Sequence, residues 1–212
     1  MRLRGEDAIL RSANPPVWLA TGNKHKVDEA KATLEKYGIQ VRQLNIIKTE
    51  IQSFSLEDVV RYASEELSGS SEQRLLAVED SGLFVSSLNG FPGPYSSYVH
   101  KTLGVQGVLQ LLANQHDRRA LFQCALALSG PGFRTKIFTG TVPGRIASSA
   151  EGSSGFGFDP IFIPKGARLT FAESGQDVKN EYSHRALAFR KLAAWYVKRW
   201  PSSHLSPNGA LK

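Results

Sequence analysis

Two adjacent carboxylates, Glu79 and Asp80, interrupt an otherwise apolar stretch of the chain. Residues 75–78 before them and residues 83–88 after the following Ser-Gly pair are each expected to form a strand. A carboxylate is costly to bury unless a cation or hydrogen-bond donors meet it. The sequence therefore predicts a cation beside this acidic pair.

A third carboxylate, Glu50, lies in residues 48–52 (KTEIQ), directly after the strand expected at residues 41–47. If that strand neighbours the one ending at residue 78, Glu50 and Asp80 emerge at the same edge of the sheet. Converging carboxylates make a hard oxygen site suited to Mg²⁺, which would also carry phosphate oxygens. We interpret this metal as the missing cation, with solvent-exposed acids in a loop as the alternative.

Residues 20–26 (ATGNKHK) form a candidate anion site, because a strand ends there and a helix begins after a Thr-Gly-Asn turn. The free N–H groups and the dipole of a helix N-terminus favour a negative charge. Lys24 and Lys26 in the first turn oppose that dipole, and an anionic ligand would remove the penalty. A capped helix with solvated lysines is the alternative.

Residues 154–160 (SGFGFDP) place a phenylalanine and a carboxylate on a glycine-supported loop. An aromatic ring that stacks and an acceptor for hydrogen bonds are what a purine pocket requires. Lys179 and residues 183–185 (SHR) supply donors at the start of the last expected helix. Residues 90–98 (GFPGPYSSY) are interpreted as a rigid turn followed by hydroxyl groups.

Several other classes of site are excluded by their missing motifs. The chain has no GxxxxGK[ST] phosphate loop, no GxGxxG, no HExxH among its five histidines, and no GxSxG around Ser81. Its single cysteine, Cys124, lies in an apolar run and is interpreted as a core thiol, which fits a reducing, cytoplasmic compartment. No stretch approaches a membrane span, and the charged first residues resemble no export signal.

The 212 residues suffice for one substantial domain or two small lobes, and the net charge of +7 suits a polyanionic partner or solubility alone.

Strands are expected at residues 17–20, 41–47, 75–78, 83–88, 120–129, 134–142 and 161–163. Helices are expected at residues 23–37, 55–67, 95–103, 105–114 and 183–200. Strands and helices alternate and then strands pair directly, which predicts an α/β class with a mixed sheet. Residues 17–200 form the expected domain, and residues 1–16 and 201–212 are interpreted as a flexible extension and tail.

Six motifs occur in a specific order: TGNKHK, EIQ, VEDSGL, GFPGPYSSYV, GFGFDPIF, and a lysine followed by SHR. Together they resemble the inosine triphosphate pyrophosphatase family over residues 17–200, and the EIQ and YSSYV forms are most similar to archaeal members. The resemblance implies an elongated mixed sheet flanked by helices, with two lobes, a central active-site cleft and a homodimer. It also implies Mg²⁺-dependent hydrolysis of ITP, dITP and XTP to the monophosphate and pyrophosphate, which removes deaminated purines from the nucleotide pool.

The resemblance also implies roles for individual residues, carried over motif by motif. Asp80 would be the general base that activates water, Glu50 and Asp80 would hold Mg²⁺, and Ser81 would touch the substrate. The residues implied for the triphosphate are Thr21, Gly22, Asn23, Lys24, His25 and Lys26. The residues implied for the base pocket are Phe156, Gly157, Phe158, Asp159, Lys179, His184 and Arg185.

Two rival functions are each suggested by part of the sequence. A Maf-type nucleotide pyrophosphatase would use similar chemistry on different bases, but the SGFGFDP and SHR segments argue against it. A basic nucleic-acid-binding module would bind DNA or RNA in a salt-dependent way without turnover. It leaves the acidic pair at residues 79–80 unexplained, so no nucleic acid is expected as a partner. No membrane is expected as a partner either, because no stretch of the sequence approaches a membrane span.

Overall fold

The computed structural model describes residues 14–68 and 74–201. The extension expected at residues 1–16 and the tail expected at residues 201–212 therefore fall almost entirely outside the described residues. Within the described ranges, no helix has the length and apolar character needed to cross a bilayer.

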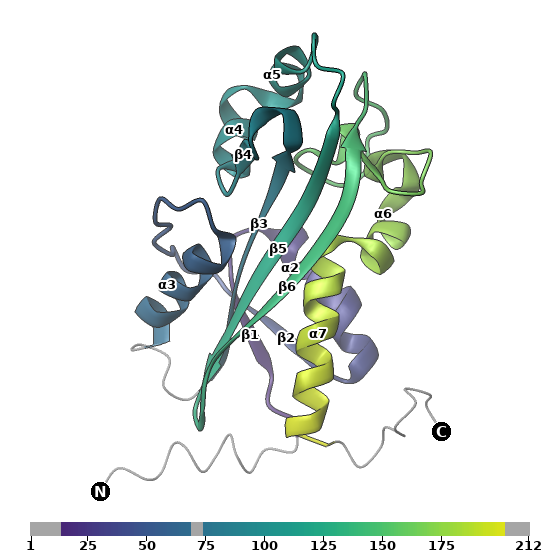
Figure 1. The fold of residues 1–212 in the computed structure, drawn as a ribbon. Coiled ribbons are helices and arrows are strands. Elements are labelled where there is room, and N and C mark those ends of the chain that lie inside the picture. The colour runs from purple at the N-terminus through teal and green to yellow at the C-terminus, as the bar shows by residue number, and fades with distance from the viewer. Residues whose placement is uncertain (1–13, 69–73, 202–212) are drawn as a thin grey trace, which may run out of the picture.

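Within the described residues, a seven-stranded mixed sheet runs the length of the molecule (Figure 1). The strands are β1 (Val17–Ala20), β2 (Val41–Leu44), β3 (Leu75–Val85), β4 (Pro92–Gly93), β5 (Arg119–Gly130), β6 (Phe133–Ile146) and β7 (Phe162–Pro164). Their order is β2-β1-β3-β5-β6-β7, with the short β4 paired to β3. Strand β1 is parallel to its neighbours β2 and β3, and the remaining pairs are antiparallel. This arrangement confirms the predicted α/β class with a mixed sheet.

The described α-helices are α2 (Lys24–Leu34), α3 (Leu56–Ser68), α4 (Ser96–Thr102), α5 (Gly104–Leu111), α6 (Phe171–Tyr182) and α7 (His184–Arg199). They flank the sheet, with α3 on one side and α2 and α7 on the other, while α4 and α5 lie at one end (Figure 1). Short 3₁₀ turns occupy Glu35–Tyr37, Ser86–Leu88 and Asp159–Ile161.

The apolar core is divided along β3, which explains how the fold makes room for a polar site. Leu75 and Ala77 belong to the cluster packed under α2 and α7, and Leu76 and Val78 belong to the cluster under α3. Leu83 and Val85 belong to a third cluster near α4, α5 and β7. Residues 79–82 of the same strand therefore lie between the first two clusters and the third.

The structure corrects several expected boundaries. The strands expected at residues 75–78 and 83–88 are one continuous strand, because pairing with β5 continues through Glu79 and Asp80. The strand expected at residues 41–47 ends at Leu44, and Ile47 is 96% exposed. The helix expected at residues 23–37 ends as α2 at Leu34 and continues as a 3₁₀ turn.

Helix α6 was not expected from the sequence, although its N-terminus carries a recognisable signal. Thr170 and Glu173 form a capping box, in which the threonine side chain accepts from the Glu173 N–H and the glutamate accepts from the Thr170 N–H. Gly175 interrupts the helix with a φ of 80°, which breaks the hydrophobic period that would have revealed it. This helix matters because it carries Lys179.

Candidate active site

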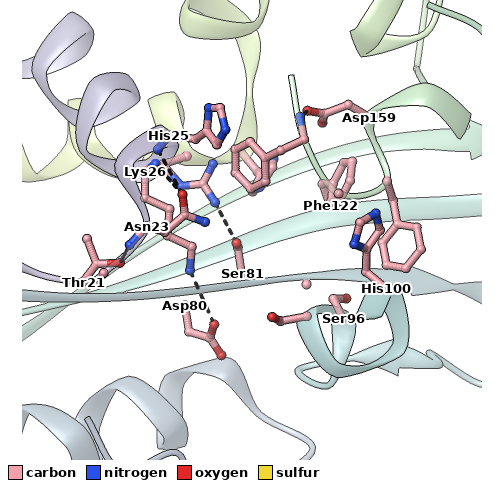
Figure 2. A pocket seen from close by; sticks show the side chains of 18 of the residues that line it. Thr21, Asn23, His25, Lys26, Asp80, Ser81, Ser96, His100, Phe122 and Asp159 are labelled. Atoms are coloured by element: carbon pink, nitrogen blue, oxygen red, sulfur yellow. Dashed lines mark hydrogen bonds and ion pairs between the residues drawn. The ribbon is translucent and has the colours of Figure 1, made fainter. Parts of the chain in front are cut away.

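A cleft of about 550 Å³ opens beside residues 80–82 of β3, between the core clusters (Figure 2). Its lining comes from the turn before α2, the middle of β3, helix α4, the loop at residues 154–159 and the region where α6 meets α7. Every site residue expected from the sequence lines this cleft except Lys24, whose side chain is exposed outside it. Segments separated by more than a hundred residues in sequence are thus brought to one place.

The turn before α2 is ordered by its own side chains. Oδ1 of Asn23 accepts from the N–H groups of His25 (3.0 Å) and Lys26 (3.4 Å), so Asn23 is the N-cap of the helix. Oγ1 of Thr21 accepts from the N–H of Asn23 at 3.1 Å, and the amide of Gln43 donates to the Thr21 carbonyl at 2.9 Å. The turn is therefore fixed in position at the cleft without a ligand.

Glu79 finds its cations within the protein, not in a metal ion as interpreted from the sequence. Its carboxylate lies 2.8 Å from Nζ of Lys26 and 3.0 Å from Nε of Arg185, and the Cys124 thiol donates to it at 3.3 Å. Burial alone would raise the pKa of Glu79, but Arg185 and Lys26 hold it well below its usual range. Glu79 is therefore a buried, ionised carboxylate.

Asp80 has a different environment from its neighbour and faces the cleft (Figure 2). Among the described residues, Asp80 makes a single weak ion pair, at 3.9 Å to Nζ of Lys26, and it is 8% exposed. Burial raises the pKa of Asp80, and the nearby charges of Glu79 and Glu50 raise it further, against the opposing effect of Lys26 and Lys48. A carboxylate with a raised pKa at the wall of a cleft is suited to accept a proton.

Glu50 also lines the cleft, as expected, and its side chain is 57% exposed. Oε1 of Glu50 pairs with Nζ of Lys48 at 2.9 Å, and the same ammonium donates to the Glu79 carbonyl at 3.2 Å. Among the described residues, no group of three or more His, Cys, Asp or Glu side chains could hold a metal by itself. Glu50 and Asp80 are thus two carboxylates on one cleft, and phosphate oxygens of a substrate would complete a hard oxygen set.

Buried ion pairs organise the other side of the cleft. Nζ of Lys179 lies 2.8 Å from Glu29 and 2.6 Å from Asp159. Arg185 binds Oε2 of Glu29 at 2.6 Å and donates to the Ser81 hydroxyl at 2.8 Å. Burial would raise the pKa of Glu29, but Arg185 and Lys179 lower it to about 2.

Glu29 was missed by sequence reasoning, because a glutamate in a surface helix ordinarily faces solvent. Nothing in its sequence neighbourhood predicts that Lys179 and Arg185, about 150 residues later, come to lie against it. The packing of α2 against α6 and α7 creates the site for this carboxylate.

His184 and Phe122 form a stacked pair at the base of the cleft, with ring centroids 4.6 Å apart and planes 15° apart. Burial, with the nearby Arg185 charge, holds the pKa of His184 well below its usual range, so the imidazole is neutral at neutral pH. Its buried Nδ1 has no hydrogen-bond partner within the described part of the chain. Phe122 lies in an apolar strand, and nothing in the sequence distinguishes it from a core residue.

The loop at residues 154–159 is held by its own carboxylate. Oδ2 of Asp159 accepts from the Phe156 N–H at 2.7 Å, and the same oxygen binds Lys179. Gly155 has a φ of 79°, and a Cβ there would lie 2.2 Å from Oδ2 of Asp159, so only glycine fits. The Phe156 ring is consequently presented to the cleft, with Nζ of Lys179 4.2 Å from its centroid.

Helix α4, which agrees closely with the helix expected at residues 95–103, contributes a wall of the cleft, and sequence reasoning placed none of its residues in the site. The Ser96 hydroxyl accepts from the Leu83 N–H at 2.8 Å and donates to the Gly93 carbonyl at 2.7 Å, which fastens α4 to β3. The other cleft residues of this helix are Ser97, His100 and Lys101. Lys48, in the loop after β2, was likewise not expected among the site residues.

Comparisons with known proteins agree with this architecture. The model of the Ham1 family matches residues 17–195. A dITP/XTP pyrophosphatase of Ignicoccus hospitalis is 49% identical over 177 residues, covering 84% of this chain and 94% of the relative. Another from Hyperthermus butylicus is 48% identical over 185 residues, covering 87% of this chain and 96% of the relative.

Solved structures show the same fold. The Ham1 protein of Staphylococcus aureus superposes with a TM-score of 0.74 at 32% identity, covering 85% of this chain and 97% of that one. A HAM1 protein from Coxiella burnetii gives 0.73 at 27% identity, covering 87% and 99%. These matches confirm the resemblance found in the sequence motifs and support it over the Maf-type alternative.

Proposed function

The chain belongs to the Ham1 family, and from that membership we propose that it hydrolyses dITP, ITP and XTP to the nucleoside monophosphate and pyrophosphate. The observation that carries the proposal is Asp80, a carboxylate that faces a cleft otherwise rich in cations. The anionic triphosphate supplies a charge complementary to those cations, and Asp80 supplies the base that attack by water requires.

We propose that the triphosphate lies between the turn before α2 and the loop after β2. Lys26 and Lys48 line this part of the cleft. Nζ of Lys26 lies 3.9 Å from Asp80, and Nζ of Lys48 pairs with Glu50 and donates to the Glu79 carbonyl. Their positive charge would offset the negative charge that develops on the phosphates during attack. Asp80 would accept the proton of the water that attacks the α-phosphorus, and pyrophosphate would leave.

The donor set of the cleft fits a divalent metal, and we propose that Glu50 and Asp80 hold Mg²⁺. Both are hard oxygen donors, Glu50 is half exposed, and Mg²⁺ ordinarily combines one or two carboxylates with substrate phosphates. When bound, Mg²⁺ would neutralise phosphate charge and orient the leaving group. Lys48 would then have to release Glu50, since it pairs with that carboxylate here.

For the base, we propose that Phe156 stacks on the purine and that Lys179 recognises its edge. A lysine ammonium has three N–H donors, and two of them are accounted for by Glu29 and Asp159. The third can donate to the 6-oxo group of hypoxanthine or xanthine, an acceptor where adenine has an amino donor. A site built on hydrogen bonds can discriminate such pairs by several orders of magnitude.

We further propose that the protein works as a homodimer in the cytoplasm, since the family resemblance implies the dimer and the lone buried thiol suits a reducing compartment. Light scattering coupled to gel filtration would measure the oligomeric state. A mass near that of the 23.2 kDa chain would contradict the dimer.

Product analysis tests the proposed reaction. Wild-type protein is incubated with dITP, XTP, dATP and dGTP, with and without Mg²⁺, and the products are separated by anion-exchange chromatography. We expect dIMP and pyrophosphate from dITP in one step, with far slower turnover of dATP and dGTP. Accumulation of dIDP with free phosphate would contradict attack at the α-phosphorus, and equal turnover of all four nucleotides would contradict the proposed base recognition.

A further inference from the structure

His25 makes an aromatic contact across the cleft. Its ring stacks on Phe156 with centroids 5.2 Å apart and planes 17° apart. His25 belongs to the first turn of α2, whereas Phe156 belongs to the loop after β6, so the contact joins segments from different sides of the cleft. The motif resemblance had assigned His25 to the triphosphate, and this ring contact points to another partner.

The side chains of His25 and Lys26, which are neighbours in sequence, point in different directions. The His25 N–H is already bound to Asn23, and no hydrogen bond or ion pair of its imidazole occurs among the described residues. The next residue, Lys26, instead pairs with Glu79 at 2.8 Å and points to Asp80, as Figure 2 shows for Asp80. Lys26 therefore serves the acidic end of the cleft, while the His25 ring covers the Phe156 ring.

The two rings are not equally fixed. Phe156 is held by the hydrogen bond from its N–H to Asp159 and by the Lys179 ammonium 4.2 Å from its ring centroid. His25 is an exposed side chain whose only described ring contact is Phe156. A purine between the two rings needs planes about 7 Å apart, since each stacked gap takes about 3.5 Å. At a centroid separation of 5.2 Å the pair is closed, and His25 is the ring that is free to move.

We propose that His25 and Phe156 form an aromatic clamp for the purine base, in which the His25 ring swings out to admit the base and then stacks on it. The clamp rests on the proposed function, because it deepens the base recognition of the same site. It makes His25 a contact of the base and not of the phosphates. A stacking partner grips any purine, so the clamp contributes affinity while the hydrogen bonds of the pocket contribute selectivity.

Calorimetric titration with two probes separates base contacts from phosphate contacts. The probes are IMP, which carries the base, and inorganic tripolyphosphate, which carries only the phosphate chain. They are titrated into wild-type protein, His25→Ala, His25→Phe and the matched control His116→Ala, whose histidine is exposed and outside the cleft lining. Thermal unfolding shows that each variant folds.

We expect His25→Ala to weaken IMP binding at least about fivefold, the effect of losing one stacking partner, and to leave tripolyphosphate binding unchanged. His25→Phe should restore IMP binding to within about twofold, because it keeps a stacking ring, and the control should match wild type. If His25→Ala loses affinity equally for IMP and tripolyphosphate, His25 contacts the triphosphate and the clamp is overturned. Unchanged IMP binding in His25→Ala, or failure of His25→Phe to restore it, would also overturn it.

The hydrolysis of dITP by wild-type protein is measured separately, which keeps the two proposals distinguishable. If wild-type protein hydrolyses dITP but His25→Ala binds IMP as tightly as wild type, the clamp alone is contradicted. If the variants bind IMP as expected but wild-type protein does not hydrolyse dITP, the proposed function is contradicted and the clamp is supported. If wild-type protein binds no IMP, the clamp is overturned as well.

Discussion

Nζ of Lys26 lies 2.8 Å from Oε2 of Glu79, so the first turn of α2 is bound directly to the middle of β3. From Glu79 an unbroken series of ion pairs, each between 2.6 and 3.0 Å, continues under the cleft. Its further members are Arg185, Glu29, Lys179 and Asp159. Because the proposed phosphate and base sites share this series, a substitution in one member is expected to affect both.

Lys26→Ala should lower kcat/KM for dITP by an amount equivalent to roughly 2–4 kcal/mol of transition-state stabilisation. The substitution removes the cation nearest Asp80 among the described residues and leaves Glu79 with the Arg185 ion pair and the Cys124 thiol. Steady-state kinetics measures the effect. Lys36→Ala is the matched control, since Lys36 is exposed beyond the other end of α2 and outside the cleft lining. A normal kcat/KM in Lys26→Ala would show that this lysine supports only the fold.

Glu29 should make the protein sensitive to acid. Its pKa is lowered from 4.5 to about 2 in the folded state, so the carboxylate stabilises the fold above its unfolded-state pKa. That contribution is lost progressively as the pH falls from about 4.5 towards 2. We therefore expect the free energy of unfolding to drop over this range, as measured by urea denaturation at a series of pH values.

Glu29→Gln should already be less stable at pH 7, by about 3–5 kcal/mol, because it leaves two buried cations with one partner fewer. Its stability should then fall less than that of wild type between pH 5 and 2. Glu57→Gln, at an exposed position in the first turn of α3, should keep the wild-type pH profile. Parallel profiles for Glu29→Gln and wild type would rule out Glu29 as a source of the acid sensitivity.

The features that sequence reasoning predicted correctly are encoded locally. The mixed α/β class follows from alternating and paired apolar segments, and the turn before α2 follows from Asn23 as a cap. The segments of the cleft were found because each carries unusual residue types in one short stretch, such as residues 154–160. Such patterns can be recognised in the sequence because they depend on turn chemistry and periodicity within one short segment.

The features that were missed depend on contacts between distant segments. Glu79 and Asp80 suggested a break between two strands, but antiparallel pairing with β5 carries the strand through them. The cations that make this possible come from Lys26 and Arg185, 53 and 106 positions away in sequence from Glu79. Burial of Glu29 likewise arises only when α6 and α7 pack against α2.

Glu50→Gln should weaken Mg²⁺ binding in the presence of nucleotide by at least about tenfold, because an amide is a poorer ligand than a carboxylate. Titration with Mg²⁺ in a thermal-shift assay measures this without turnover. Stability without metal should change little, since the Glu50 side chain is half exposed and Lys48 keeps its hydrogen bond to the Glu79 carbonyl. An unchanged Mg²⁺ dependence would remove Glu50 from the proposed metal site.

Asp80→Asn tests the proposed general base. The substitution keeps the size of the side chain and removes a charge that lies close to Glu79 and Glu50, so the variant should fold at least as stably as wild type. Its cleft should still bind the base, because Phe156 and Lys179 are unchanged. Thermal unfolding and IMP titration check these two expectations before activity is measured.

Turnover by Asp80→Asn should be slower by at least about 100-fold at saturating dITP and Mg²⁺, because asparagine cannot take a proton from water and is a weaker metal ligand. Single-turnover kinetics assigns the loss to the chemical step. Titration with Mg²⁺ shows whether added metal recovers any rate, which separates the two causes. Near-normal turnover in the folded variant would place the base elsewhere. Glu79 would be a poor substitute, because Arg185 and Lys26 already bind its carboxylate and hold its pKa low.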